Sequence, residues 1–218
     1  GVSANGCHTN VSLWKGGELK STPIGNDPLP GMEQVFTHIS GGENMFMPDP
    51  KIDEVKPGPV GLNSIAGLLK HLPALTCLGS PTVNSYRRLW DTGFWAPVYA
   101  DWGYQNRTCS VRVSAPGRVE YRSVDSSHNP YLMGAGILKA FEDGLDNKMN
   151  PGEPEKKNIY DAMKAGKEVD KLPLTLGEAI QRLESDDIVR AALPEDMLRV
   201  FMHYKKDEWE KFLSAVTQ

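Results

Sequence analysis

The stretch from residue 108 to residue 123, TCSVRVSAPGRVEYRS, decides how this chain folds. It contains two runs, TCSVRVS and GRVEYRS, in which apolar residues alternate with polar ones, as they do in half-buried β-strands. Between the runs, Ala115-Pro116-Gly117 is a compact turn signal, because proline presets one corner and glycine accepts the positive φ angles of tight turns. The sequence therefore predicts an antiparallel hairpin.

The second strand of this hairpin carries a row of charged residues. Arg118, Glu120 and Arg122 stand two residues apart, so their side chains point to one face of the sheet, while Val119 and Tyr121 point to the other. Two interpretations are open. The row could be a solvated sheet face with cross-strand ion pairs, or a floor on which Glu120 binds a divalent metal ion and the arginines hold phosphate oxygens.

The hairpin lies within a window that uses arginine and no lysine. Lysine is the commoner of the two in the whole chain, yet residues 87–122 contain six arginines: Arg87, Arg88, Arg107, Arg112, Arg118 and Arg122. A guanidinium group stays charged and presents a rigid fork of donors to carboxylate or phosphate, whereas an ammonium group is a mobile point charge. The window therefore predicts a site that handles oxyanions.

Composition limits the identity of the anion. The chain has 28 acidic and 24 basic residues, so it lacks the positive excess that nucleic-acid binding needs, and a small anionic ligand is favoured. The chain contains no run of eighteen apolar residues, so the sequence predicts no membrane-spanning helix. Three cysteines without CxxC spacing indicate neither a disulfide framework nor a zinc site, so the expected location is the cytoplasm.

The rest of the chain predicts an α+β protein with a β-rich first part and a helical C-terminal part. Residues 3–13 alternate loosely as a strand, and PVYADW at 97–102 is another strand candidate. Residues 14–60 are rich in Gly, Pro, Asn and Asp, and the run MPDPKIDEVKPGP is a loop by composition. A helix is expected from about Asn63, with a break or kink at Pro73.

The later helices have clear signals. Asn129-Pro130 is a strong helix start, because Asn caps the first turn and Pro fits the first helical position. Residues 174–186 and 195–216 predict two further amphipathic helices with solvated charged faces. His38, His71, His128 and His203 lie in no motif and are interpreted as ordinary histidines.

Five motifs together resemble the catalytic domain of glutamine synthetase. They occur in family order and are HTNVS at 8–12, PTVNSYRRL at 81–89, NRT at 106–108, RVEYR at 118–122 and NPYL at 129–132. The chain is most similar to the bacterial type III subgroup, which includes γ-glutamylmethylamide synthetases. The resemblance implies an antiparallel β-sheet with packed helices, related to the guanido kinase fold, and identifies residues 1–218 as a C-terminal catalytic domain.

The resemblance implies a site for metal and glutamate. His8 and Glu120 match residues that bind one of the Mg²⁺ or Mn²⁺ ions bridging the ATP phosphates. Arg88 and Arg122 match the arginines that hold the glutamate carboxylates. At the amino end of glutamate the family reads Asn-Gly-x-Gly-x-His, but this chain has Ser3 and Ala4 in the first two places. Asn5 and Gly6 are the glutamate-binding candidates that remain in that stretch.

The resemblance also implies the reaction. Arg107, Arg112 and Arg118 match arginines at the transferring phosphate and the nucleotide, with Arg107 the catalytic candidate, and Ser12 matches a residue of the nucleotide site. The implied activity is ATP-dependent conversion of glutamate to γ-glutamyl phosphate, followed by attack of an amine. Phosphoryl transfer depends on positioning and charge neutralisation, which metals and arginines supply.

The amine site departs from the family. Where glutamine synthetases commonly read Gly-Tyr-Glu-Ala-Pro, this chain reads GFWAP at 93–97, so Trp95 replaces a glutamate that helps to deprotonate ammonium. An indole cannot act as a base, but its face attracts alkylammonium ions. Either the acceptor is methylamine or another small alkylamine, in place of or beside ammonia, or Trp95 only packs the flap and another carboxylate removes the proton.

The family also implies what surrounds this chain. Most of the metal carboxylates and an N-terminal β-domain precede the position of Gly1 in the family, and a neighbouring subunit closes each active site in a ring. We therefore expect the C-terminal part of a longer polypeptide that assembles as a homo-oligomer, a ring-shaped dodecamer. Two alternatives are a non-catalytic relative that binds glutamate or nucleotide, and a phosphagen kinase, whose cysteine and substrate-loop motifs are not evident.

Overall fold

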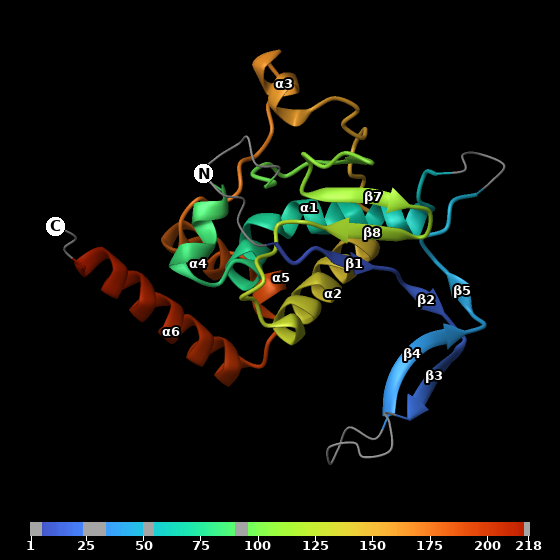
Figure 1. Ribbon diagram of the computed structural model, residues 1–218, viewed down its shortest axis with the longest axis horizontal. Coiled ribbons are helices and arrows are strands. Elements are labelled where there is room, and N and C mark those ends of the chain that lie inside the picture. The colour runs from blue at the N-terminus through green and yellow to red at the C-terminus, as the bar shows by residue number, and fades with distance from the viewer. Residues whose placement is uncertain (1–5, 24–33, 50–54, 90–95, 216–218) are drawn as a thin grey trace.

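The computed structural model describes residues 6–23, 34–49, 55–89 and 96–215. A four-stranded sheet lies at its centre, in the order β1 (Thr9–Val11), β8 (Arg118–Tyr121), β7 (Val111–Ala115) and β6 (Trp102–Tyr104) (Figure 1). β7 and β8 pair antiparallel around a turn in which Gly117 has a φ angle of 77°. The predicted hairpin and the α+β fold class are confirmed.

The sheet is mixed, because β6 pairs with β7 in parallel. Residues 105–110 return the chain from the end of β6 to a point beside its first residue, so that Trp102 lies opposite Val111 at the start of β7. Of the strand predicted at 97–102, only Trp102 joins this sheet, as the first residue of β6. The backbone of residues 98–100 instead bonds to residues 170–172, through Ala100 N–H to Asp170 O and Leu172 N–H to Val98 O. Alternation in the sequence did not reveal which partner this segment would take.

Residues 14–60 contain four short strands that their composition did not predict. β2 (Trp14–Lys15) pairs with β5 (Glu43–Asn44), and β3 (Glu18–Pro23) pairs with β4 (Gln34–Ser40), both antiparallel. The glycine pairs at 16–17 and 41–42 have positive φ angles and lie opposite each other where the two ladders meet. The resulting ribbon extends away from the central sheet (Figure 1). The glycines that suggested a loop therefore serve as corners between strands.

Two long helices, α1 (Pro59–Gly79) and α2 (Pro130–Asp146), pack closely against each other. A Cβ atom added to Gly67 would lie 2.0 Å from Ala140 O, and one added to Gly144 would lie 2.2 Å from Asn63 O. These glycines allow the two backbones to approach. α1 continues through Pro73, so of the predicted break or kink the break does not occur, and the kink stays a prediction. The burial of Leu72, Ala74 and Leu75 around the proline favours the intact helix.

The core joins the back of the sheet to these helices. Val119 and Tyr121 are fully buried and belong to the same apolar cluster as the leucines of α1, which confirms the predicted alternation along β8. The shorter helices η1 (Val83–Leu89), α3 (Ile159–Lys164), α4 (Leu176–Glu184) and α5 (Asp187–Arg190), together with the long α6 (Glu195–Ser214), complete the described chain. No helix of the described residues is long and apolar enough to cross a membrane.

One histidine interpreted as ordinary is not. His71 of α1 is 2% exposed, and each of its ring nitrogens faces a carboxylate: Nε2 lies 2.8 Å from Asp143 of α2, and Nδ1 lies 2.7 Å from Asp186, which caps α5. Both ring nitrogens can donate only in the protonated ring. The two carboxylates accordingly raise the pKa of His71, although burial lowers it. This ion-paired cluster joins three helices.

The predicted start of α2 is also confirmed, and it can be tested. The Asn129 side chain accepts hydrogen bonds from the N–H groups of Tyr131 and Leu132 at 2.9 and 3.3 Å. We expect Asn129→Ala to lower the free energy of unfolding by about 1 kcal/mol, because these N–H groups lose their acceptor. Asn129→Asp keeps an acceptor and should stay close to the wild type in urea unfolding. Equal losses in the two variants would contradict a capping role.

Candidate functional site

The face of the sheet opposite the core carries a row of polar residues centred on Glu120. Asn10 of β1 lies opposite Glu120 of β8, and Arg112 of β7 lies opposite it on the other side. Register partners on neighbouring strands point to the same face. Glu120 is 6% exposed and Arg122 is 3% exposed, so this part of the row is not a solvated surface. The first interpretation is therefore wrong about solvation at Glu120 and Arg122, whereas the cross-strand ion pair that it expected is present between Arg112 and Glu120.

The two oxygens of the Glu120 carboxylate face different partners. Oε2 accepts a hydrogen bond from Arg112 Nη1 at 2.8 Å, and Arg122 Nη1 lies 3.5 Å from the same oxygen. Oε1 lies 3.1 Å from His8 Nδ1. The arginines hold and orient the carboxylate, which leaves Oε1 and the His8 ring together on one side.

The electrostatic surroundings favour neutral His8. Burial lowers the pKa of His8, the positive charge of Arg122 lowers it further, and the opposing effect of Glu120 does not compensate. A neutral imidazole has a free lone pair and can bind a metal ion. Among the residues that the structure describes, no group of three or more His, Cys, Asp or Glu side chains could hold a metal. His8 and Glu120 nevertheless fit Mg²⁺, which takes few protein ligands.

Arg88 is fixed beside this centre by backbone carbonyls. It comes from η1, is 8% exposed, and donates from Nη1 to Val124 O at 3.0 Å and from Nη2 to Arg122 O at 3.2 Å. A Cβ atom added to Gly6 would lie 2.9 Å from Arg88 Nη2, so the guanidinium lies directly against this glycine. The structure thus brings together Arg88 and Gly6, two of the predicted glutamate-binding residues.

The remaining arginines differ in how they are held. Arg122 Nη2 donates to Arg107 O at 2.8 Å, which ties the turn carrying Arg107 to the centre of the site. The Arg107 side chain is exposed and makes no hydrogen bond or ion pair within the described part of the chain. Arg118 is exposed at the start of β8, on the Glu120 side of the strand. Arg107 and Arg118 are therefore available to an anion, whereas Arg112 is bound to Glu120.

Other predicted residues are less central or fall outside the description. Ser12 lies just beyond β1, and its Oγ accepts a hydrogen bond from Trp14 Nε1 at 2.9 Å. Asn5 and Trp95 lie outside the described residues. The predicted roles of these three residues stay predictions.

Sequence reasoning missed two residues of this site. Asn10 stands opposite Glu120, and its alternation with His8 and Ser12 was a signal for a shared face. Gln105 has a φ angle of 48°, accepts a hydrogen bond from Arg112 Nη2 at 2.8 Å and donates to Ser114 O at 2.5 Å. A β-bulge between Arg112 and Ala115 places the Ser114 carbonyl out of register. No pattern in the sequence indicated this contact.

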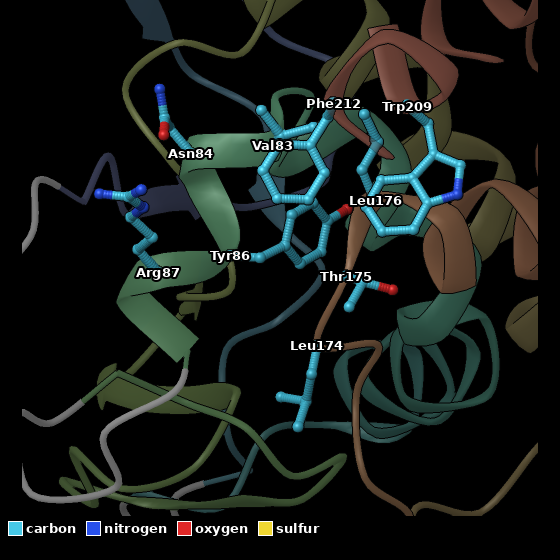
Figure 2. A pocket seen from close by; sticks show the side chains of 9 residues that line it. All are labelled: Val83, Asn84, Tyr86, Arg87, Leu174, Thr175, Leu176, Trp209 and Phe212. Atoms are coloured by element: carbon cyan, nitrogen blue, oxygen red, sulfur yellow. The ribbon is translucent and has the colours of Figure 1, made fainter. Parts of the chain in front are cut away.

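A separate hollow of about 400 Å³ lies between η1, the segment before α4 and the end of α6. Figure 2 shows its mainly apolar wall, formed by Val83, Tyr86, Leu174, Leu176, Trp209 and Phe212. Asn84 and Arg87 line it too, and in Figure 2 their polar ends point away from the rings of the wall. None of the predicted site residues lines this hollow.

Comparison with known proteins points to one family. Residues 31–218 match the family model described as "Glutamine synthetase, catalytic domain". The glutamine synthetase of Pyrococcus abyssi is 40% identical over 221 residues, which cover 98% of this chain and 43% of that protein. The glutamine synthetase of Thermotoga maritima is 37% identical over 224 residues, covering 100% of this chain and 45% of that protein.

Solved structures agree with this match. A structure described as "Apo GmaS without ligand" has a TM-score of 0.77 and 31% identity, and covers 98% of this chain and 43% of that chain. A second, "GmaS/ADP complex-Conformation 1", has a TM-score of 0.78 and 32% identity, and covers 98% and 44%. The chain thus spans less than half the length of these relatives.

Proposed function

Because the chain belongs to the glutamine synthetase family, we propose that it forms the C-terminal catalytic part of an ATP-dependent ligase. This ligase joins the γ-carboxylate of glutamate to ammonia or a small alkylamine through γ-glutamyl phosphate. The single observation that supports it best is the Glu120 carboxylate, with one oxygen toward His8 and the other toward two arginines. The Glu120 carboxylate can bind a metal ion, and the arginines around it supply positive charge for phosphate and carboxylate groups. The proposed reaction needs both in one site.

In this proposal, His8 and Glu120 hold Mg²⁺ or Mn²⁺. The metal ion, when bound, neutralises the charge of the ATP phosphates. Arg112 and Arg122 orient the Glu120 carboxylate, and burial together with the charge of Arg122 lowers the pKa of His8, which favours the neutral ring. The support for these roles is that a neutral imidazole ring has a lone pair with which to bind a cation.

The arginines divide the anions between them. Arg88, held against Gly6 by two backbone carbonyls, binds the glutamate carboxylates together with Arg122. Arg107 faces the phosphoryl group in transfer, and Arg118 and Ser12 face the nucleotide. Arg112 attracts the phosphates by its charge, and it also orients Glu120, to which it donates a hydrogen bond. Burial lowers the pKa values of Arg88 and Arg122, which makes each guanidinium gain more from an anionic partner.

The complete polypeptide is proposed to be a homo-oligomer in the cytoplasm, a ring-shaped dodecamer. The support is that this chain offers two metal ligands and most of the arginines, which is too little for turnover. The family resemblance assigns most of the metal carboxylates to an earlier segment, and it implies that a β-domain of the neighbouring subunit closes the active site. Analytical ultracentrifugation of the complete polypeptide would test the assembly.

The amine is proposed to be methylamine or another small alkylamine, in place of or beside ammonia, because Trp95 stands where glutamine synthetases commonly have glutamate. Two solved structures similar to this chain are of GmaS, a γ-glutamylmethylamide synthetase. We expect kcat/KM for methylamine to equal or exceed that for ammonia, since a pocket that accepts one methyl group gains about 1 to 3 kcal/mol. Steady-state ADP release with glutamate, ATP and ammonia, methylamine or ethylamine measures this. A preference of more than about tenfold for ammonia would contradict it.

The same assay separates the ligase from its alternative. A ligase releases ADP only when glutamate and amine are both present in excess over the enzyme. A non-catalytic relative that binds glutamate or nucleotide would show binding in calorimetry without ADP release. Retention of Arg107 favours the ligase, since a binding protein has no need for an arginine at the transferring phosphate. The phosphagen kinase alternative is set aside by the family to which the chain belongs.

A further inference from the structure

The turn that carries Arg107 is held by the side chain before it. Asn106 uses its whole hydrogen-bonding capacity: Oδ1 accepts from Thr108 N–H at 3.0 Å and from Thr108 Oγ1 at 2.6 Å. Its Nδ2 donates to Glu155 O at 3.1 Å and to Lys157 O at 2.7 Å. An amide side chain offers two donors and one oxygen with two lone pairs, so Asn106 is saturated.

These bonds join the turn to a distant segment. Residues 155–159 lie about fifty positions along the chain from Asn106, and Thr108 extends the link, because its Oγ1 accepts from Ile159 N–H at 3.0 Å. The same segment is tied to the sheet by Glu155 N–H, which donates to Trp102 O at 2.8 Å. Lys167 adds a second tie, with Nζ 2.7 Å from the Glu155 carboxylate and 2.5 Å from Asp101.

Arg107 lies between the two residues that make this link, and no other residue that the structure describes holds its side chain. Its carbonyl accepts a hydrogen bond from Arg122 Nη2 at 2.8 Å, so the backbone of the turn is fixed from both sides. The guanidinium of Arg107 projects from a rigid turn with its donors available to an anion. A long exposed side chain loses less freedom on binding when its backbone is already in place.

We propose that Asn106 is a positioning residue for the ligase reaction: it fixes the turn so that Arg107 meets the phosphoryl group in transfer, with the 155–159 segment as its support. This inference rests on the proposed function, because Arg107 needs an anion to act upon. It adds a role for residues 155–159, which carry none of the predicted site residues.

The first test is Asn106→Asp in the complete polypeptide. Aspartate has the same shape and still accepts from Thr108, but an oxygen replaces the Nδ2 donor and faces the carbonyls of Glu155 and Lys157. We expect kcat to fall by about 10- to 100-fold, because a small misplacement of a group acting in the transition state has effects of this size. KM for glutamate should change by less than about twofold, since Arg88 is not affected. Asn150→Asp, at an exposed asparagine, is the matched control and should leave both constants unchanged.

A double-mutant cycle distinguishes positioning from general damage. If Asn106 acts through Arg107, then Asn106→Asp should have little further effect on kcat in an Arg107→Ala background. If the substitution only harms the fold, its effect should be the same in both backgrounds. An additive result overturns the proposal, and so does a wild-type kcat in Asn106→Asp. Thr108→Val, which removes the hydroxyl that both Asn106 and Ile159 use, should follow the same pattern.

Amide hydrogen exchange gives a readout that does not depend on activity. In the wild type, the N–H groups of Thr108 and Ile159 should be protected, and Asn106→Asp should increase exchange at Ile159 and its neighbours. Unchanged protection would overturn the link between the turn and the 155–159 segment. If the wild type released no ADP with any amine, the proposed function would fail, while this exchange experiment would still decide whether Asn106 holds the turn.

Discussion

Glu120→Gln should abolish measurable ligase turnover, with a loss in kcat of about 10³-fold, equivalent to about 4 kcal/mol of transition-state stabilisation. The substitution keeps the size of the side chain but removes its negative charge. His8 then has no anionic partner for a shared cation, and Arg112 and Arg122 face an uncharged amide. Because the centre of the site loses its negative charge, both metal binding and arginine orientation should suffer.

Two measurements on the complete polypeptide check this expectation. ADP release gives kcat, and calorimetry gives the dissociation constant for Mn²⁺, which should rise by at least about tenfold. Glu142→Gln, at an exposed position of α2, is the matched control and should behave as the wild type. Turnover within about threefold of the wild type in Glu120→Gln, with circular dichroism unchanged, would remove Glu120 from the proposed mechanism.

The second large effect concerns stability. His71→Gln should lower the free energy of unfolding at pH 6 by about 3 kcal/mol, because it leaves the carboxylates of Asp143 and Asp186 without their shared cation in a buried place. In this variant Asp143 keeps two partners. Lys70 Nζ lies 2.8 Å from its carboxylate, and the Asn147 side chain donates a hydrogen bond to it. Asp186 keeps the N–H of Val189 as a donor.

The same cluster predicts how stability depends on pH. The pKa of His71 is raised above 6.5 in the folded protein, so its contribution is complete below pH 6.5 and is lost as pH rises through the raised value. The pKa values of Asp143 and Asp186 are lowered from 3.8, so their contribution is present above that pH and is lost as pH falls further. The difference between the wild type and His71→Gln should therefore be largest near pH 5 to 6 and decrease toward alkaline pH.

Urea unfolding of the complete polypeptide at a series of pH values from about 5 to 9 measures this difference. His203→Gln, at an exposed histidine of α6, provides the control for the loss of a histidine and should unfold as the wild type does. A constant difference between the wild type and His71→Gln over the whole range would show that His71 contributes by packing and not by its proton.

Local patterns predicted the parts of the fold that depend on near neighbours. The hairpin at 108–123, the cap at Asn129 and the helices at 174–186 and 195–216 followed from alternation, capping and helical periodicity. The strands within 14–60 were missed, because their glycines count as loop residues in a window of composition. The partner of residues 97–102 was also missed, since alternation gives the direction of side chains but not the identity of the neighbouring segment.

Some features of the candidate site were likewise predicted from the sequence, and others were not. The spacing of Glu120 and Arg122 placed them on one face, and the motif around His8 identified it as a ligand candidate. Neither observation could show that Arg112 and Arg122 share one Glu120 oxygen while His8 faces the other. Gln105 and Asn106 were not singled out, because their roles depend on contacts with a bulged strand and with residues 155–159.

The fold class, the hairpin, the family and the residue types of the site were all predictable from the sequence. This was possible because periodicity, turn chemistry and motifs act over a few residues. The contacts among these residues depend on the tertiary structure. Packing brings His8, Arg88, Arg107 and Glu120 together from four separate segments of the chain. The tertiary structure also places His71 between the carboxylates of Asp143 and Asp186, which raise its pKa. The sequence did not distinguish this histidine from the others, because a pKa depends on the groups that surround the side chain.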